Sequence, residues 1–182
     1  MKTLVLVFHP DLKNALMNQA VADNLELLPH ITVRRLYDIY AKGTINVVKE
    51  QMLLEQADRI VFQFPFSWYS GPALLKEWQE EVLGGSWLAG EQKKRLAGKT
   101  LLAVTTLDPQ MATDHWEKDD LLRPLQALAH DLGLCYHSPV FLEEKPQESR
   151  QEMEERVRHY VGYVLQPDPC KNKYEECTNE KG

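Results

Sequence analysis

Short apolar runs alternate with amphipathic stretches along most of this chain. Strand-like segments, most of them continuously apolar, occupy residues 3–8, 31–36, 60–64, 100–106 and 134–142. Between and after them, apolar residues recur at helical spacing in segments 13–28, 47–56, 72–82, 119–132 and 147–165. A continuous apolar run is typical of a strand covered on both faces, and 3.6-residue spacing indicates a helix with one buried side. The pattern therefore predicts five strands alternating with five helices.

This alternation predicts the fold class. Strands separated by helices imply a parallel sheet with right-handed crossovers, and the length suits the flavodoxin-like strand order 2-1-3-4-5. We expect a three-layer α/β sandwich with a five-stranded sheet in residues 1–165. Residues 166–182 are polar and aperiodic, and they are predicted to be a loosely ordered C-terminal tail. The connection 37–44 is predicted to be irregular, and Pro65 is predicted to end the third strand.

The predicted strand order brings three loops together. The first, third and fourth strands are neighbours in that order, and they are followed by residues 9–10, 65–69 and 105–108. Ligands of open α/β sheets bind at the carboxyl ends of the strands, where the strand order reverses. We therefore expect the three loops to form one site.

An aromatic pair stands in the second of these loops. Trp68 and Tyr69 follow Pro65 and precede Gly71 and Pro72, where the next predicted helix begins. The two rings could stack on a flat heterocycle such as an isoalloxazine, or they could plug the space beneath the following loop. The residues alone leave both interpretations open.

The first loop offers groups that suit an anion. Residues 9–18 could direct the N–H groups of a helix N-terminus toward a phosphate, with Lys13, Asn14 and Asn18 as further donors. No glycine-rich phosphate-binding motif is present, so an ordinary strand-to-helix turn is the alternative. His9 is equally consistent with a phosphate contact and with a hydrogen-bonded structural histidine.

Further candidates follow the fourth strand. Thr105 and Thr106 offer hydroxyls and backbone N–H groups at its end, although a plain strand terminus is an equal alternative. His115 lies in the next loop, where a substrate could bind. No carboxylate is fixed near it by the sequence, so an exposed loop residue is the alternative.

Composition narrows the class of protein. The 182 residues are 43% hydrophobic and 26% charged, as in one soluble domain, and a net charge of −6 argues against nucleic-acid or anionic-membrane binding. No apolar run approaches the roughly 20 residues that span a bilayer, so direct membrane insertion is not expected. Three scattered cysteines predict no disulfide framework and favour the cytoplasm. Cys135 is predicted to be an inert buried thiol, and Cys170 and Cys177 match no zinc pattern.

One motif carries a resemblance to a known family. It reads Phe64-Pro65-x-x-Trp68-Tyr69-Ser70-x-Pro72-x-Leu74-Leu75-Lys76-x-Trp78, supported by FHP, LYDIY and LAGKTLLAVTT elsewhere. The chain resembles the NAD(P)H:quinone oxidoreductase family, in the small bacterial branch that includes general stress protein 14. That branch also holds ancillary subunits of glutathione-gated potassium efflux systems. The likeness extends over residues 1–165.

The resemblance implies a flavodoxin-like homodimer that binds FMN (FAD in larger relatives). NAD(P)H would reduce the flavin by hydride transfer, and a quinone-like acceptor would take the electrons. It also allows a cytoplasmic protein held at the inner face of the membrane through a potassium-efflux transporter. Tyr69 and His115 are the candidate catalytic residues. The cofactor-binding positions that the resemblance implies are His9, Ala15, Met17, Asn18, Phe66, Ser67, Trp68, Tyr69, Thr105, Thr106, Leu107 and Asp108.

Some of these positions depart from the family pattern. Ala15 stands where relatives have serine, and Leu107 and Asp108 stand where they have two glycines. Glycines let backbone N–H groups approach a ring closely, whereas larger side chains hinder that approach. These departures favour a second hypothesis, a regulatory ancillary subunit of a potassium efflux system with weak or absent flavin chemistry. A flavodoxin-like electron carrier is a third, disfavoured by the mild acidity of the chain.

Overall fold

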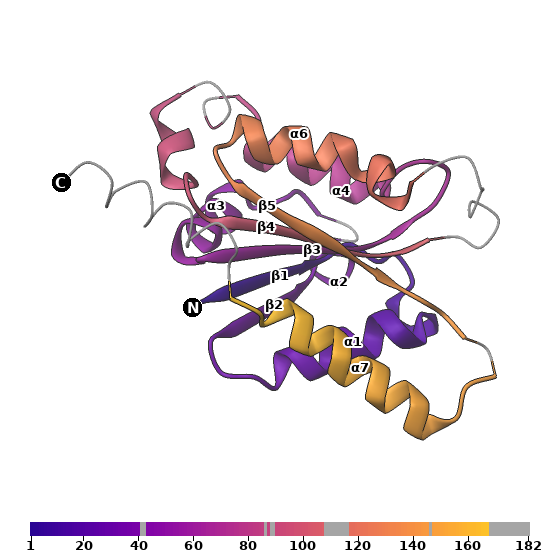
Figure 1. The fold of residues 1–182 in the computed structure, drawn as a ribbon. Helices are drawn as coiled ribbons and strands as arrows, with labels where there is room; N and C mark the ends of the chain where they lie inside the picture. Colours follow the sequence, from indigo (N-terminus) through magenta and orange to yellow (C-terminus); the bar gives the residue numbers. More distant parts are fainter. Residues whose placement is uncertain (41–42, 86, 88–89, 108–116, 146, 168–182) are drawn as a thin grey trace.

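The sheet has the order predicted from the sequence. The computed structural model describes residues 1–40, 43–85, 87, 90–107, 117–145 and 147–167. Within these residues, five parallel strands form one sheet of order β2-β1-β3-β4-β5 (Figure 1). The strands are β1 Thr3–Val7, β2 Ile31–Arg35, β3 Arg59–Phe66, β4 Thr100–Leu107 and β5 Cys135–Leu142.

Helices cover both faces of the sheet and complete the three-layer sandwich (Figure 1). One face is covered by α1 (Leu16–Glu26) and α7 (Arg150–Val164). The other face is covered by α3 (Val47–Gln56), α4 (Ala73–Trp78) and α6 (Arg123–Asp131). Each layer of helices encloses its own apolar core against the sheet, which is the expected way for a doubly wound fold to bury its strands.

The third strand runs further than predicted. Pro65 was expected to end it, but β3 continues through Pro65, which pairs with Thr106, to Phe66. Proline cannot donate to a neighbouring strand, so it is tolerated where one side has no partner. The ladder between β1 and β3 ends at Gln63, and the neighbouring strand is therefore absent where the N–H of residue 65 would be needed. The prediction of a break at Pro65 was wrong for this reason.

Two further expectations need correction. Segment 37–44, expected to be irregular, is helical at its start, because α2 spans Leu36–Tyr40. Cys135, expected to be an inert buried thiol, is only partly buried and takes part in a disulfide bond. Residues 168–182, which contain the other two cysteines, lie outside the described residues. Within the described part of the chain, no helix has the length and apolar character to cross a membrane.

Candidate cofactor site

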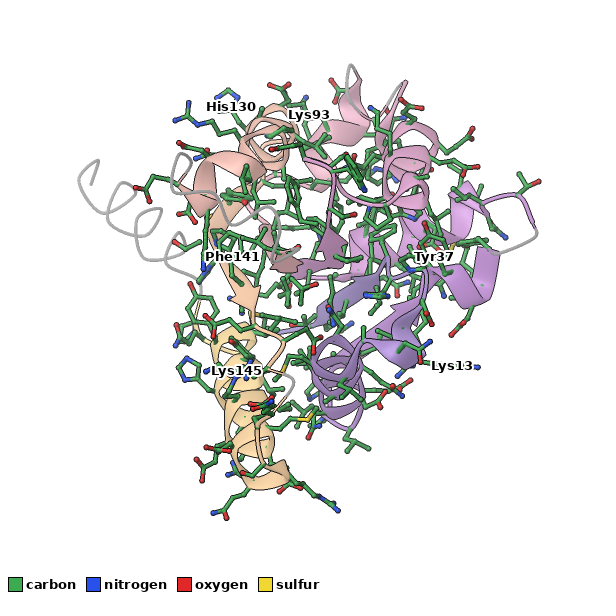
Figure 2. All side chains as sticks on the ribbon, turned by 90° about the vertical axis from the view of Figure 1, so that its right-hand side faces the viewer. Lys13, Tyr37, Lys93, His130, Phe141 and Lys145 are labelled. Atoms are coloured by element: carbon green, nitrogen blue, oxygen red, sulfur yellow. The ribbon has the colours of Figure 1, made fainter. Side chains whose placement is uncertain are left out.

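The carboxyl ends of β3, β4 and β5 enclose a cavity of about 540 Å³. We call it the strand-end cavity, and Figure 2 views this edge of the sheet, with Phe141 and Lys145 on one flank. Four predicted cofactor-binding residues line it, namely Phe66, Ser67, Thr106 and Leu107. Its remaining described lining residues are Pro65, Lys118, Phe141, Leu142, Glu143, Glu144 and Lys145.

Two other predicted residues line separate cavities. His9 lines a cavity of about 500 Å³ together with Lys13 and Tyr37, which lie on the opposite flank of the edge in Figure 2. Tyr69 lines an apolar cavity of about 450 Å³ between α4 and α6. Six of the predicted residues therefore line three separate cavities. Asp108 and His115 lie outside the described residues.

A tight turn presents the aromatic pair to solvent. Ser67 and Ser70 exchange two backbone hydrogen bonds of 3.0 Å each across the turn. The two residues between them have left-handed backbone angles, with φ of +50° at Trp68 and +59° at Tyr69. Two successive positive φ values are characteristic of a type I′ turn. The Trp68 and Tyr69 side chains are 88% and 63% exposed, which excludes the interpretation that they plug the space beneath a loop.

Buried polar contacts fix the wall of the strand-end cavity to α1. The Asn18 amide nitrogen Nδ2 donates to the Thr106 hydroxyl at 3.2 Å, and Gln63 Nε2 donates to the Asn18 carbonyl at 2.7 Å. Asn18 is 1% exposed, so its side chain makes this internal contact and does not point to solvent. Thr105 is also buried, and its hydroxyl donates to the Phe64 carbonyl at 2.7 Å. Of the two threonines, Thr106 faces the cavity and Thr105 joins β4 to β3.

The first loop has a small histidine-centred contact. His9 Nδ1 accepts a 3.2 Å hydrogen bond from the backbone N–H of Asp11. Burial lowers the pKa of His9, and the negative charge of Asp11 opposes that shift. Neutral His9 is thus the form that keeps the contact, because a protonated ring nitrogen cannot accept a hydrogen bond. Asn14 is likewise used locally, donating to the Asp11 carboxylate at 2.8 Å.

The start of α1 carries a contact from a distant segment. Ala15 stands at the N-cap position and Met17 lies in the first turn with its side chain in the core. The backbone N–H of Met17 donates to Glu144 Oε1 at 3.3 Å. Burial raises the pKa of Glu144, while the Met17 N–H and the charge of Arg156 oppose this shift. The helix end where an anion was expected thus holds a carboxylate of the chain itself.

Sequence reasoning missed the contribution of the fifth strand. Glu144 and Lys145 follow β5, Phe141 lies within it, and Lys118 contributes its ammonium, 5.9 Å from the centre of the Phe141 ring. The predicted strand order could have revealed this contribution. Parallel strands end at one edge of the sheet, so the loop after the fifth strand lies at the same edge as the other loops.

Comparison with known proteins identifies the family. A family model described as having a flavodoxin-like fold matches residues 1–164. The chain belongs to this flavodoxin-like family. General stress protein 14 of Bacillus subtilis (strain 168) is 36% identical over 173 residues, which cover 92% of this chain and 99% of that protein.

Two other relatives carry different names. An uncharacterized NAD(P)H oxidoreductase of Bacillus subtilis (strain 168), YrkL, is 40% identical over 142 residues, covering 75% of this chain and 82% of that protein. The ancillary protein KefG of a glutathione-regulated potassium-efflux system from Enterobacter sp. (strain 638) is 33% identical over 174 residues. These residues cover 92% of this chain and 95% of that protein.

Solved structures agree with the fold. General stress protein 14 of Treponema denticola in complex with FMN has a TM-score of 0.80 at 30% identity, covering 90% of this chain and 98% of that chain. An NADPH-quinone reductase from P. pentosaceus has a TM-score of 0.80 at 28% sequence identity, and the match covers 92% of this chain and 100% of that chain. A chain described as a thermophilic tryptophan halogenase from Streptomycin violaceusniger has a TM-score of 0.82 at 38% sequence identity. The match covers 91% of this chain and 99% of that chain. Their names differ, and their common geometry establishes the fold.

Proposed function

We propose that this protein is an FMN-dependent NAD(P)H:quinone-type oxidoreductase. The observation that carries the proposal is the strand-end cavity at the carboxyl edge of a flavodoxin-like sheet, beside two exposed aromatic side chains. The solved relative that binds FMN and the relatives named as NAD(P)H oxidoreductase and NADPH-quinone reductase support it.

The residues of the strand-end cavity fit a flavin nucleotide. Phe66 and Leu107 offer apolar walls for a planar ring, while the Thr106 hydroxyl offers a hydrogen-bonding group. Lys118 and Lys145 offer ammonium groups that can pair with a phosphate. Glu143 and Glu144 line the same cavity and balance this charge, and Glu143 lies 3.7 Å from Lys145. This combination of apolar surface and a few polar groups is typical of cofactor sites.

The roles of the residues follow from these positions. FMN, when bound, supplies the redox chemistry by taking hydride from NAD(P)H and passing electrons to a quinone-like acceptor. The chain contributes binding and orientation. The Asn18–Thr106 contact holds the cavity wall in place, and Trp68 and Tyr69 offer exposed ring faces on which a planar substrate can stack.

Flavin binding and turnover test the proposal in sequence. Titration of the purified protein with FMN should quench flavin fluorescence and saturate at one flavin per chain. The loaded protein should then oxidise NADH or NADPH with a soluble quinone as acceptor. Absence of saturable FMN binding would overturn the proposal.

A homodimer is the assembly that the resemblance implies, and it is also a proposal here. The apolar cavity between α4 and α6, with exposed Tyr69 at its edge, provides a surface that a second copy could cover. Light scattering coupled to size-exclusion chromatography would measure the mass directly. A monomeric mass at micromolar concentration would contradict it.

The second candidate function is a regulatory subunit of a potassium efflux system. It is supported by the KefG relative, which matches nearly the whole chain, and by the departures at Ala15 and Leu107. FMN binding without quinone turnover, together with co-purification with a potassium-efflux transporter, would favour this function over the first.

A further inference from the structure

The N-terminus of α1 lacks a cap from its own sequence. Ala15 at the N-cap has no side chain that can accept a hydrogen bond, and the first turn contains no acidic residue. The first N–H groups of a helix have no partners within the helix, and they lie at the positive end of its dipole. This 11-residue helix therefore begins with N–H groups that favour an anion.

Glu144, which is distant in the sequence, supplies a hydrogen-bond acceptor for one of these N–H groups. Its Oε1 accepts the Met17 N–H at 3.3 Å across a sequence separation of 127 residues. The distance lies at the long limit for an N–H···O hydrogen bond, so the contact is weak. Glu144 is an exposed residue whose carboxylate is only partly buried, so the carboxylate has room to move away from the helix.

Glu144 also lines the strand-end cavity, next to Thr106 and Ser67. The positive end of α1 and the proposed flavin cavity therefore meet at this carboxylate. Arg156 and Glu148 are the neighbouring charges that act on it, in opposite directions. Arg156 is already engaged, because its guanidinium donates to Glu148 and to the Glu143 carbonyl.

Gln63 places a second buried polar group at the same helix end. Gln63 is fully buried, and its amide nitrogen contacts Asn18 in the first turn of α1. Its amide oxygen Oε1 is buried and has no hydrogen-bond partner among the described residues. Buried acceptors are normally satisfied, so this oxygen calls for a donor such as a ligand hydroxyl or an ordered water.

We propose that Glu144 is an internal anionic ligand of the α1 N-terminus, and that a phosphate group entering the cavity must displace its carboxylate. Two negative groups cannot share these N–H donors without repulsion. Glu144 thus determines how strongly the site discriminates between a flavin that carries a phosphate and one that does not. This inference rests on the proposed flavin function.

FMN and riboflavin, which lacks the phosphate, separate the role of charge from the role of the ring. Removal of the carboxylate in Glu144→Ala should tighten FMN binding by about tenfold, as expected for relief of one like-charge contact. Riboflavin affinity should stay within about twofold, since only the phosphate meets Glu144. Glu144→Gln keeps an acceptor but loses the charge, so it should also bind FMN more tightly. This variant tests the same effect if Glu144→Ala fails to fold.

Glu155→Ala is the matched control. Glu155 is an exposed carboxylate on α7 and is not among the described residues that line the strand-end cavity. Dissociation constants from flavin fluorescence quenching should be unchanged in this variant. An unchanged or weaker FMN affinity in both Glu144 variants would overturn the inference, as would an equal gain for riboflavin or for Glu155→Ala.

A measurement without flavin distinguishes this inference from the proposed function. If no variant binds any flavin, the proposed function fails, and inorganic phosphate becomes the probe. Glu144→Ala should then gain a larger phosphate-dependent rise in Tm than the wild type and Glu155→Ala, relative to chloride at equal ionic strength. Equal rises in all three proteins would overturn the role of Glu144.

Discussion

Asn18 and Thr106 connect the first turn of α1 to the end of β4 by a buried hydrogen bond of 3.2 Å. The same asparagine receives the Gln63 amide through its carbonyl, so three elements meet at one polar cluster. Polar groups buried in an apolar interior are costly unless they are paired. The cluster therefore fixes the relative positions of α1, β3 and β4, where the proposed site is formed.

Replacement of Asn18 by leucine should destabilise the protein. Asn18→Leu keeps the approximate volume but leaves Thr106 without its donor, which should lower the free energy of unfolding by about 1–3 kcal/mol. Asn24→Leu is the matched control, because Asn24 lies on the same helix and is exposed. That change should stay within about 0.5 kcal/mol in urea-unfolding experiments.

The contact itself can be isolated by a double-mutant cycle. Thr106→Val removes the acceptor, and the pair of substitutions together should cost less than the sum of the two single changes. A coupling energy of about 0.5–1.5 kcal/mol is expected for one hydrogen bond. Additive effects would mean that the Asn18–Thr106 contact contributes nothing measurable.

The aromatic turn predicts opposite effects on stability and on binding. Left-handed backbone costs a non-glycine residue roughly 1–2 kcal/mol, and Trp68 loses little packing on removal because it is 88% exposed. Trp68→Gly should therefore raise the free energy of unfolding by about 1 kcal/mol. If the ring serves as a stacking surface, the same variant should bind the flavin or turn over the quinone less well.

Trp68→Phe separates these two effects. Phenylalanine keeps an aromatic face and the left-handed backbone, so stability should stay near wild type and most of the activity should remain. Thermal unfolding and quinone-reductase rates would be measured on all three proteins. A glycine variant that is less stable than the wild type would contradict the strain argument.

The order of strands and helices could be predicted from the sequence, but the buried side of each helix could not always be predicted. Segment 13–28 was predicted to be one helix with a buried apolar side, yet Leu16 is 65% exposed, while Met17 and Leu25 are buried. A separate short helix (Leu12–Asn14) precedes α1, so the helix begins at Leu16 rather than Lys13. Strands buried on both faces, such as β1 and β4, tolerate such offsets. The face of a helix does not, because one residue rotates it by about 100°.

The site was predictable to the extent that strand ends determine it. Phe66, Ser67, Thr106 and Leu107 share a cavity because parallel strands end at one edge. The contact between Glu144 and α1 joins residues 127 positions apart and follows no local pattern. Such a contact depends on how α7 and the loop after β5 pack, which periodicity does not encode. The role of all these residues in cofactor binding stays a prediction.

His9 predicts a specific pH dependence of stability. Burial lowers its pKa below the ordinary value of 6.5, so the unfolded chain takes up a proton before the folded protein does. Above that value both states are neutral and His9 contributes no pH dependence. As the pH falls through 6.5 toward the lowered pKa, the free energy of unfolding should decrease.

Urea unfolding from about pH 8 to pH 5 checks this dependence. His9→Gln should lose less stability than the wild type over the acidic part of that range, because its side chain does not titrate. His159→Gln, at an exposed position on α7, is the matched control and should follow the wild type. Parallel curves for wild type and His9→Gln would contradict the expected protonation effect.

A buried carboxylate on α3 gives the sharpest stability prediction. Glu50 is 0% exposed and accepts hydrogen bonds from Arg34, from the Tyr40 hydroxyl at 2.6 Å and from Trp78 Nε1 at 3.3 Å. Removal of one partner from a buried ion pair leaves the other charge uncompensated. Glu50→Gln should therefore lower the free energy of unfolding by about 3–5 kcal/mol.

Glu55 on the same helix provides the matched control. It pairs with Arg95 at 2.6 Å, but both side chains are substantially exposed, and surface pairs contribute about 0–1 kcal/mol. Glu55→Gln should thus be nearly neutral in the same urea-unfolding experiment. The double variant Arg34→Met/Glu50→Gln should be more stable than Glu50→Gln alone, because it removes the orphaned charge. The amide oxygen of Gln can still accept from Trp78 Nε1, and the Tyr40 hydroxyl can accept from the amide nitrogen. A double variant less stable than the single one would show that Arg34 stabilises the fold independently of Glu50.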